Sequence, residues 1–373
     1  MNLPRTMFLL FSSASLCGQI SAAQIVPSND WHDPSPHHRE MIAVDQGVQL
    51  EVLDWGGSGQ PLVFLSGLGN TAHIWDNFAL KFTDNHHVYA ITRRGFGRST
   101  HATTGYTPER LADDILAVMD QLKLEKPVLV GHSIAGEELS FIGTHHPERV
   151  SALIYLDAAY TYAFYDEAGD YEASLKGLRM KIDALDGKPD DTALMNQVKT
   201  ALPQFEENLN RKSNSLENPL PRLYDPPSTA DKADFAAMMK KMTIIIGGVP
   251  PEAELHESFL SGPNGAIGPS NAAPEASPAI NKSYEHFTAP IHLPILAIMS
   301  DPQSKGPNFH ADTPENVAAG AAADANQERQ IAAFEKGQPT ARVIRMADAH
   351  HYVFISNESQ VETEMKKFLA ALP

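Results

Sequence analysis

Short, continuously apolar runs recur along most of the chain, and each has about the length of one buried strand. Turn residues separate them, and several are followed by stretches whose apolar positions recur every three or four residues. Continuously apolar strands are typical of a sheet that helices cover on both faces. The pattern therefore predicts an α/β fold with a mostly parallel sheet, whose strands we place at residues 48–55, 61–66, 86–92, 127–132, 150–157, 293–300 and 341–346.

Three helices are predicted most clearly. In the first, Thr107 can cap the amino terminus, Pro108 takes the first helical position, and an apolar stripe follows. The second follows Thr313 and Pro314, is rich in alanine and ends at Gly337. The third covers residues 356–372. The stripes of the first and third helices consist of Leu111, Ile115, Met119 and Leu122, and of Val361, Met365, Phe368 and Leu372.

A long segment interrupts this alternation. About 135 residues separate Asp157 from Leu293, which is far more than one crossover between parallel strands requires. Because the strand pattern resumes afterwards, we expect a helical lid inserted at 158–289 with a loop-like stretch at 261–278, rather than a second independent domain. The core then comprises residues 41–157 and 290–373.

The amino-terminal residues differ from the rest. Residues 1–23 combine one positive charge, a short apolar run and small residues before Ala23, which is typical of a cleavable signal peptide. We therefore expect a secreted or periplasmic protein that loses its single cysteine, Cys17. A lipid anchor on Cys17 is the alternative, although Leu16 is a poor match for it. Residues 24–40 read as a solvated polar linker; prolines among its histidines, His32, His37 and His38, argue against a regular metal site.

Composition limits the partners. The chain has 373 residues and a formal charge of −17, which opposes association with nucleic acid or with anionic membranes. No later apolar run is long enough to span a bilayer. The glycine-rich stretch 66–69 lacks the lysine of a phosphate-binding loop. We expect a small-molecule substrate, no stable membrane anchoring, no cofactor and no metal.

The sequence Val-Leu-Val-Gly-His-Ser-Ile-Ala-Gly, residues 128–136, places Ser133 where a buried strand turns sharply into a helix. Such a corner requires small neighbours, and Gly131, Ala135 and Gly136 provide them. The stretch resembles the G-x-S-x-G nucleophile elbow of the α/β-hydrolase superfamily, with Ala135 in place of the second glycine. This resemblance implies an α/β-hydrolase fold and a nucleophilic Ser133.

The resemblance also implies a general base and an acid that follow Ser133 in that order. His351 is favoured over His350 as the base, because it directly precedes the apolar run 352–354 and a final helix. For the acid we favour Asp301, after the strand at 293–300, although Gln303 fills a position where the family often carries a carboxylate. Asp157 is the main alternative and Asp312 a more distant one.

Two backbone N–H groups are expected to bind the oxyanion. Ile134 provides one at the elbow, and Leu68 provides the other in Ser66-Gly67-Leu68-Gly69, which stands where the family commonly has His-Gly-x-Gly. The stretch 92–99 resembles another turn of the superfamily, and Arg94 is expected to brace loops there. His132 should pack within the elbow, and one of Glu137 and Glu138 is a candidate for lining the cavity.

The function implied is that of a serine hydrolase that cleaves carboxylic esters of small or medium apolar or aryl acyl compounds through an acyl-serine intermediate. A serine at the elbow argues against the dehalogenases and epoxide hydrolases of the superfamily, which use aspartate. Alternatives are an amidase or peptidase, an acyltransferase, an interfacial lipase and a non-catalytic binding protein. Several aromatic residues after Asp157 would suit an apolar substrate: Tyr160, Tyr162, Phe164, Tyr165 and Tyr171.

Overall fold

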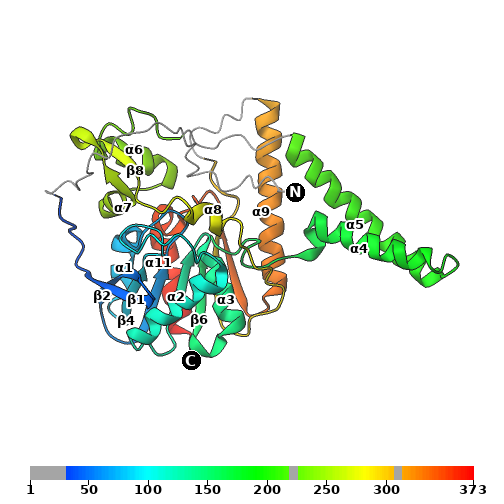
Figure 1. Cartoon of the computed structure of the whole chain (residues 1–373), viewed down its shortest axis with the longest axis horizontal. Coiled ribbons are helices and arrows are strands. Elements are labelled where there is room, and N and C mark those ends of the chain that lie inside the picture. The colour runs from blue at the N-terminus through cyan, green and yellow to red at the C-terminus, as the bar shows by residue number, and fades with distance from the viewer. Residues whose placement is uncertain (1–30, 218–225, 306–312) are drawn as a thin grey trace.

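An eight-stranded sheet forms the centre of the molecule (Figure 1). Its strands lie in the order β1-β2-β4-β3-β5-β6-β9-β10; β2 pairs antiparallel with β1 and β4, and all other neighbours are parallel. The bounds are β1 His38–Asp45, β2 Val48–Gly56, β3 Gln60–Leu65, β4 His86–Ile91, β5 Val128–His132, β6 Ala152–Leu156, β9 Ile295–Ser300 and β10 Ala341–Met346. The predicted α/β-hydrolase type of sheet is confirmed.

The computed structural model describes residues 31–217, 226–305 and 313–373. The predicted signal peptide at 1–23, with Cys17, lies outside the described residues. Within them, no helix has both the length and the apolar character needed to cross a bilayer.

Helices cover both faces of the sheet (Figure 1). Apolar side chains of α2, α3 and α9 pack in one core, and those of α1 and α11 pack in the core on the other face. The helices are α1 Asp76–Ala79, α2 Pro108–Gln121, α3 Ala135–His145, α4 Tyr171–Asp186, α5 Thr192–Glu217, α6 Phe235–Ile246, α7 Glu252–Ser258, α8 Ala276–Ile280, α9 Pro314–Gly337, α10 Val353–Ser356 and α11 Glu358–Ala370.

The caps and stripes of the predicted helices account for their positions. Thr107 accepts a hydrogen bond from Arg110 N–H at the start of α2, and Thr313 accepts one from Asn316 N–H at the start of α9. In α11, Val361 and Met365 are fully buried. The third predicted helix corresponds to α11, which begins at Glu358, two residues later than expected, because Ser356 is the last residue of α10.

Strand β1 was not predicted. Residues 38–40 fall in the expected linker, yet they pair with β2 from His38 opposite Asp54 onward. β1 is the edge strand, so its residues alternate between half-buried and exposed positions, and its sequence is correspondingly polar. Such a strand lacks the continuous apolar run that reveals the inner strands.

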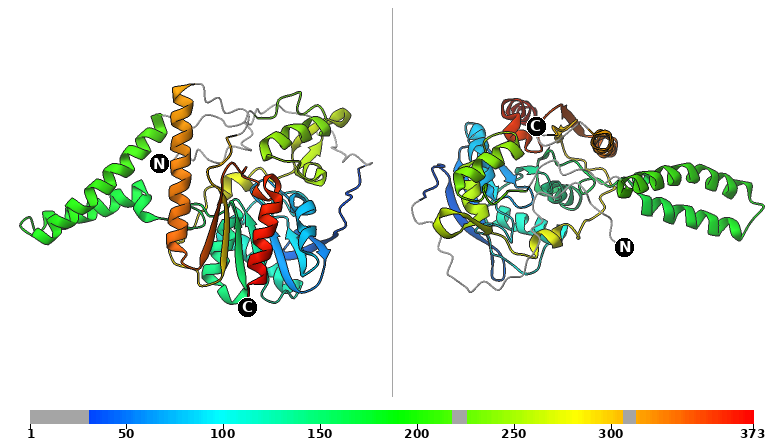
Figure 2. Two further views of the ribbon diagram at one scale, coloured as in Figure 1. Left: turned by 180° about the vertical axis from the view of Figure 1, so that it is seen from behind. Right: turned by 90° about the horizontal axis from the view of Figure 1, so that it is seen from above.

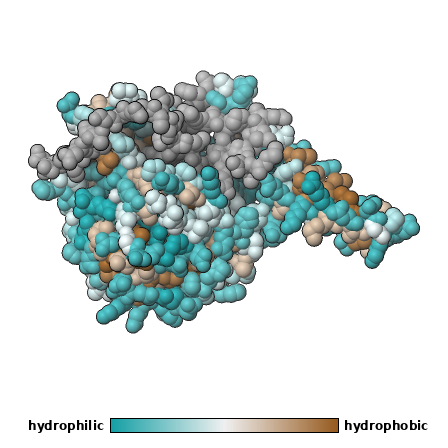
Figure 3. Space-filling view, viewed as in Figure 1, coloured by the Kyte–Doolittle hydropathy of each residue, from teal (hydrophilic) through white to brown (hydrophobic). Residues whose placement is uncertain are grey.

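The segment between β6 and β9 has two parts. Helices α4 and α5 form a hairpin that projects away from the sheet (Figure 2), while α6, α7 and a small two-stranded sheet lie above it. In the small sheet, β7 Phe259–Ser261 ends where the stretch expected to be a loop begins, and β8 Ile267–Ser270 falls inside that stretch. Apolar side chains are exposed on the hairpin (Figure 3), namely Met180, Ile182, Met195, Leu202 and Leu209.

Candidate active site

Ser133 lies at the corner between β5 and α3, with φ of 55°. This left-handed conformation is costly for a residue with a side chain, and tight packing enforces it. A Cβ on Gly131 would lie 2.9 Å from the side chain of Leu139, and one on Gly136 would lie 2.1 Å from the carbonyl oxygen of Ala158. The small residues expected around the nucleophile are therefore required by the fold.

His351 faces Ser133. It lies in the loop between β10 and α10, and its Nε2 is 2.9 Å from the Ser133 Oγ. The neighbouring His350 is placed elsewhere: its backbone N–H donates to Ser356 Oγ, and its ring packs against Gly247. The structure thus brings together the serine and the histidine that the sequence favoured.

The carboxylate that contacts His351 belongs to Asp157, so the expectation for Asp301 needs correction. Asp157 Oδ2 is 2.6 Å from His351 Nδ1, on the side of the ring opposite to Ser133. β6 lies directly beside β5 in the sheet, whereas β9 is one strand further away. The carboxyl end of β6 therefore carries Asp157 to the histidine.

Other groups hold Asp157 in place. Its side chain is fully buried, and Oδ1 accepts hydrogen bonds from the Tyr160 hydroxyl at 2.8 Å and from the Ser300 N–H at 2.8 Å. Gln327 of α9 donates in turn to the Tyr160 hydroxyl. With both oxygens engaged, the carboxylate has a fixed orientation, as is required of a group that aligns an imidazole.

Asp301 has different partners. Its carboxylate accepts a hydrogen bond from Arg345 of β10 at 3.0 Å, and its backbone N–H donates to Met346. The Asp301 carboxylate therefore pairs with Arg345 and does not hold His351. Asp312, the remaining alternative, lies outside the described residues.

The expected oxyanion loop packs against the nucleophile. A Cβ on Gly67 would lie 3.2 Å from the Ser133 Cβ and 2.8 Å from His132 Nδ1. Among the described residues, no hydrogen bond occupies the N–H of Leu68 or of Ile134. Both predicted donors are thus available beside Ser133 for an oxygen that carries developing negative charge.

His132 supports the loop that carries His351. Its Nε2–H donates to the His351 carbonyl at 3.1 Å, and the two rings are 4.7 Å apart. Complete burial, together with the nearby His351, lowers the His132 pKa well below its ordinary value. His132 therefore stays neutral and does not compete for positive charge beside His351.

Comparisons with known proteins support the observed fold. A family model described as the α/β-hydrolase fold matches residues 60–240. The chain is 33% identical over 120 residues to a non-heme chloroperoxidase of Streptomyces lividans, and 33% identical over 108 residues to a bifunctional esterase/perhydrolase of Acinetobacter calcoaceticus. These matches cover 31% and 28% of this chain, and 44% and 39% of those relatives, so the chain spans less than half of their length.

Similarity to a solved structure extends over most of the chain. The crystal structure of E-2-(acetamidomethylene)succinate hydrolase aligns with 90% of this chain and 100% of its own, with a TM-score of 0.57 and 15% sequence identity. The chain therefore has the α/β-hydrolase fold.

Two residues of this α/β-hydrolase site were missed at the sequence level. Arg93 donates to the carbonyl oxygens of Ser66 and Gly67 and pairs with Glu138 at 2.6 Å. Glu138 is therefore engaged by Arg93, whereas Arg94 pairs with Asp114 of α2. The signal for Arg93 was its place in the same turn motif as Arg94, but the motif does not tell which arginine points toward the oxyanion loop.

Glu254 of α7 is the second. Its carboxylate accepts hydrogen bonds from the Asn70 side chain at 2.8 Å, the Thr71 hydroxyl at 2.6 Å and the Ser258 hydroxyl at 2.8 Å. Complete burial raises its pKa to about 7 despite these donors. Glu254 joins α7 to the residues that directly follow the oxyanion loop. The sequence near Glu254 gives no sign of this contact, because Asn70 and Thr71 are more than 180 positions away.

The aromatic residues after Asp157 do not gather at the nucleophile as expected. Tyr162 is buried and packs against Gly136 at the start of α3, and burial raises its pKa well above the ordinary value, which keeps it a neutral phenol. The others serve the fold: Tyr160 holds Asp157, Phe164 packs against Gly337, Tyr165 stacks on His286, and Tyr171 packs against Phe205.

Proposed function

We propose that the protein is a serine hydrolase that cleaves carboxylic esters of small or medium apolar or aryl acyl compounds. The observation that carries the proposal is the continuous chain from the Ser133 hydroxyl through the His351 ring to the buried Asp157 carboxylate, beside two available backbone N–H groups. A serine hydroxyl hardly ionises near neutral pH, so it becomes a nucleophile only beside an oriented base of this kind.

In the first half of the reaction, Ser133 Oγ attacks the ester carbonyl carbon while His351 Nε2 takes the hydroxyl proton. The carbonyl oxygen becomes an oxyanion that accepts hydrogen bonds from Leu68 and Ile134, each worth about 3 kcal/mol of transition-state stabilisation. Asp157 accepts from Nδ1–H and stabilises the imidazolium. The bond to the alkoxy oxygen then breaks, and His351 gives the proton to the departing alcohol.

In the second half, water attacks the acyl-serine. His351 Nε2 removes a proton from the water as its oxygen bonds to the acyl carbon, and the same two N–H groups bind the new oxyanion. The bond between the acyl carbon and Ser133 Oγ then breaks, and the proton returns to the serine. The products are the free carboxylic acid and the resting enzyme.

A second reaction follows from the same intermediate. One relative is named a bifunctional esterase/perhydrolase, which supports perhydrolysis as a candidate activity here. Hydrogen peroxide would replace water as the nucleophile at the acyl carbon, and the product would be a peracid. Titration of peracid formed from an acetate ester and hydrogen peroxide distinguishes this reaction from hydrolysis.

We also propose a secreted or periplasmic location, supported by the signal-like sequence of residues 1–23. The net charge of −17 favours a dissolved ester over one in an anionic membrane, which sets this proposal apart from an interfacial lipase.

The proposal is tested by steady-state kinetics of the purified protein on p-nitrophenyl esters and anilides of increasing acyl length. We expect saturable ester hydrolysis that is fastest with short or medium chains, and slower amide cleavage. Ser133→Ala should lose about 10⁵-fold or more in kcat, because no other group can form the acyl intermediate.

The matched control is Ser359→Ala, which removes an exposed hydroxyl from α11 and should leave kcat unchanged. Absence of turnover on every ester would support a non-catalytic protein. Faster cleavage of anilides than of esters would favour the amidase alternative.

A further inference from the structure

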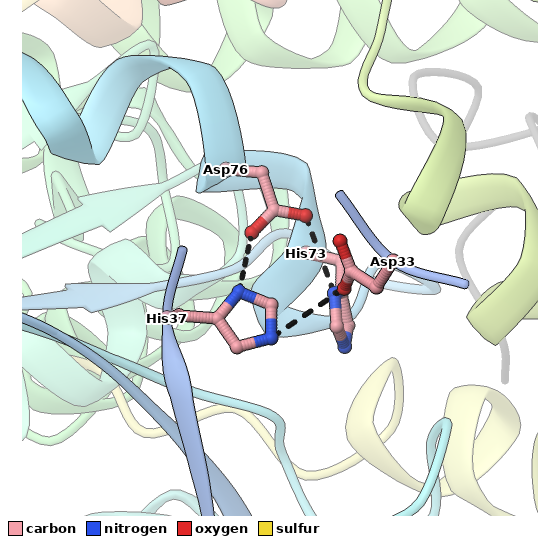
Figure 4. A group of neighbouring side chains, drawn as sticks. All are labelled: Asp33, His37, His73 and Asp76. Atoms are coloured by element: carbon pink, nitrogen blue, oxygen red, sulfur yellow. Dashed lines mark hydrogen bonds and ion pairs between the residues drawn. The ribbon is translucent and has the colours of Figure 1, made fainter. Parts of the chain in front are cut away.

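Two histidines and two aspartates gather at a place that the hydrolytic site does not use (Figure 4). Asp33 and His37 come from the segment before β1, His73 from the 3₁₀ helix η1 (Ala72–Trp75), and Asp76 from the start of α1. One ligand atom of each residue lies within 4.8 Å of those of the others. His73 and Asp76 are buried and the other two are half-buried, so the cluster is almost closed to solvent.

The spacing of these atoms suits a small cation. Asp33 Oδ2 is 3.0 Å from His73 Nδ1 and 3.4 Å from His37 Nε2, and His73 Nδ1 is 3.2 Å from Asp76 Oδ2. Four ligands at the bond lengths of a tetrahedral zinc site are separated by about 3.3 Å. The three distances are therefore close to the edges of such a tetrahedron.

The hydrogen bonds within the cluster leave one carboxylate oxygen, Asp33 Oδ2, without a hydrogen-bond partner among the described residues. His73 Nδ1 can carry one proton, yet it faces oxygens of two carboxylates. Its hydrogen bond goes to Asp76, and Asp33 Oδ2 makes no hydrogen bond within the part of the chain that is described. A cation among these atoms would give Asp33 Oδ2 a partner and would offset the repulsion between the two carboxylates.

The outer nitrogen of each histidine lies near a carboxylate. His37 Nδ1 is 3.1 Å from Asp76 Oδ1, and His73 Nε2 is 3.5 Å from Glu51 Oε1. A histidine that ligates a metal usually donates its other N–H to a carboxylate, which fixes the ring and its tautomer. In the alternative tautomer, His73 Nε2 accepts from Arg39 at 3.4 Å and its Nδ1 carries the proton.

The four-residue cluster differs in its charge balance from a second group of possible metal ligands next to it. Glu51, His73 and Glu257 also approach one another, but Arg39 pairs with Glu51 at 2.9 Å and Arg98 pairs with Glu257 at 2.8 Å, so that group is already neutralised. Among the residues that the structure describes, Asp33 and Asp76 form ion pairs with His37 and His73 only. With neutral histidines the four-residue cluster carries two negative charges, which one divalent cation balances.

We propose that Asp33, His37, His73 and Asp76 bind one Zn²⁺ ion. Two imidazole nitrogens and two carboxylate oxygens form a ligand set that zinc accepts in four-coordinate structural sites. The segment that was expected to be a solvated linker packs against the core at His37, whose side chain is 5% exposed, and the ion would tie this segment to η1. Because η1 directly follows Thr71 and the oxyanion loop, the ion would also hold the far end of that loop.

The test is zinc binding by the full chain, which needs no assay of turnover. The protein is stripped with EDTA, desalted and titrated with ZnCl₂ by calorimetry, and the retained metal is measured by mass spectrometry. We expect one zinc per chain with a Kd of about 1 μM or tighter. His37→Gln and Asp33→Asn should each weaken binding by at least about 100-fold, since replacing even an outer-shell partner costs about 10- to 100-fold.

His38→Gln is the matched control, because His38 lies in the same segment, is 72% exposed and is not in the cluster. It should bind zinc like the original protein. No zinc retained by the intact chain, or equal binding by His37→Gln and His38→Gln, would overturn the proposal. If the ligand variants do not fold, the visible spectrum of the intact chain with bound Co²⁺ tests the site instead. The intense absorption of a tetrahedral complex would support the proposal. The weak spectrum of an octahedral complex would overturn it.

Discussion

Ser133 and Asp157 share an uncommon backbone conformation. Their φ angles are 55° and 47°, and they follow directly on the adjacent strands β5 and β6. A non-glycine residue in this region is strained by about 1–3 kcal/mol, and such strain is kept where the surrounding structure enforces it. Here the conformation at the ends of β5 and β6 directs the Ser133 hydroxyl and the Asp157 carboxylate toward His351.

At Gly67, the absence of a side chain lets the oxyanion loop touch the nucleophile. An added methyl group would lie 2.8 Å from His132 Nδ1 and 3.2 Å from the Ser133 Cβ, so the loop would have to move. We expect Gly67→Ala to displace the Leu68 N–H and to lower kcat by about 100-fold, the effect of losing one oxyanion donor. Steady-state kinetics on the best ester of the panel measures it, and KM should change little.

Gly177→Ala is the comparison for this change. Gly177 lies in α4, where an added methyl group meets only the end of the Lys181 side chain at 3.8 Å. It should leave kcat unchanged. If Gly67→Ala keeps full kcat, the second donor does not come from this loop.

Among the elements, α7 joins the inserted segment to the residues that directly follow the oxyanion loop. Glu254 provides this connection through Asn70 and Thr71. Its pKa is raised to about 7 by burial, so the folded state binds the proton more tightly than the unfolded chain, whose glutamate has an ordinary value of 4.5. The stabilisation is therefore complete below about pH 4.5 and is lost as the pH rises through 7.

This difference in pKa corresponds to a fall of about 3 kcal/mol in the free energy of unfolding between pH 4.5 and 7. We expect Glu254→Gln to remove that part of the pH dependence, because the amide does not titrate. Urea unfolding at several pH values over this range measures it for both proteins. The comparison variant is Glu252→Gln on the same helix, where the side chain is 57% exposed. A Glu254→Gln slope equal to that of the original chain would show that Glu254 is already ionised at low pH.

Elements with a local signal were predictable, and elements held by distant contacts were not. Helix α2 has its own cap and stripe, and the inner strands have continuous apolar runs, so residues near one another in sequence suffice to locate them. β1 is recognisable only through its pairing with β2, and β7 and β8 only through each other. Their sequences carry little apolar pattern because the sheet edge and the inserted segment bury little of them.

In the whole molecule, the candidate site depends on strand order. Ser133, Asp157 and His351 are joined by β5, β6 and the loop after β10, and 194 positions separate the acid from the histidine. The elbow motif revealed Ser133 because its constraints are local. The choice between Asp157 and Asp301 was open because both residues follow buried strands, and only the hydrogen bond of Asp301 to Arg345 and the fixed orientation of Asp157 separate them.

The rate at which a fluorophosphonate probe labels Ser133 tests this arrangement most directly, with the labelled peptide identified by mass spectrometry. In Asp157→Asn the amide would face His351 Nδ1 and impose the wrong tautomer, so we expect labelling to slow by about 10⁴-fold, while Asp301→Asn should label at nearly the original rate. Rapid labelling of Asp157→Asn together with slow labelling of Asp301→Asn, or a label on a residue other than Ser133, would contradict the account.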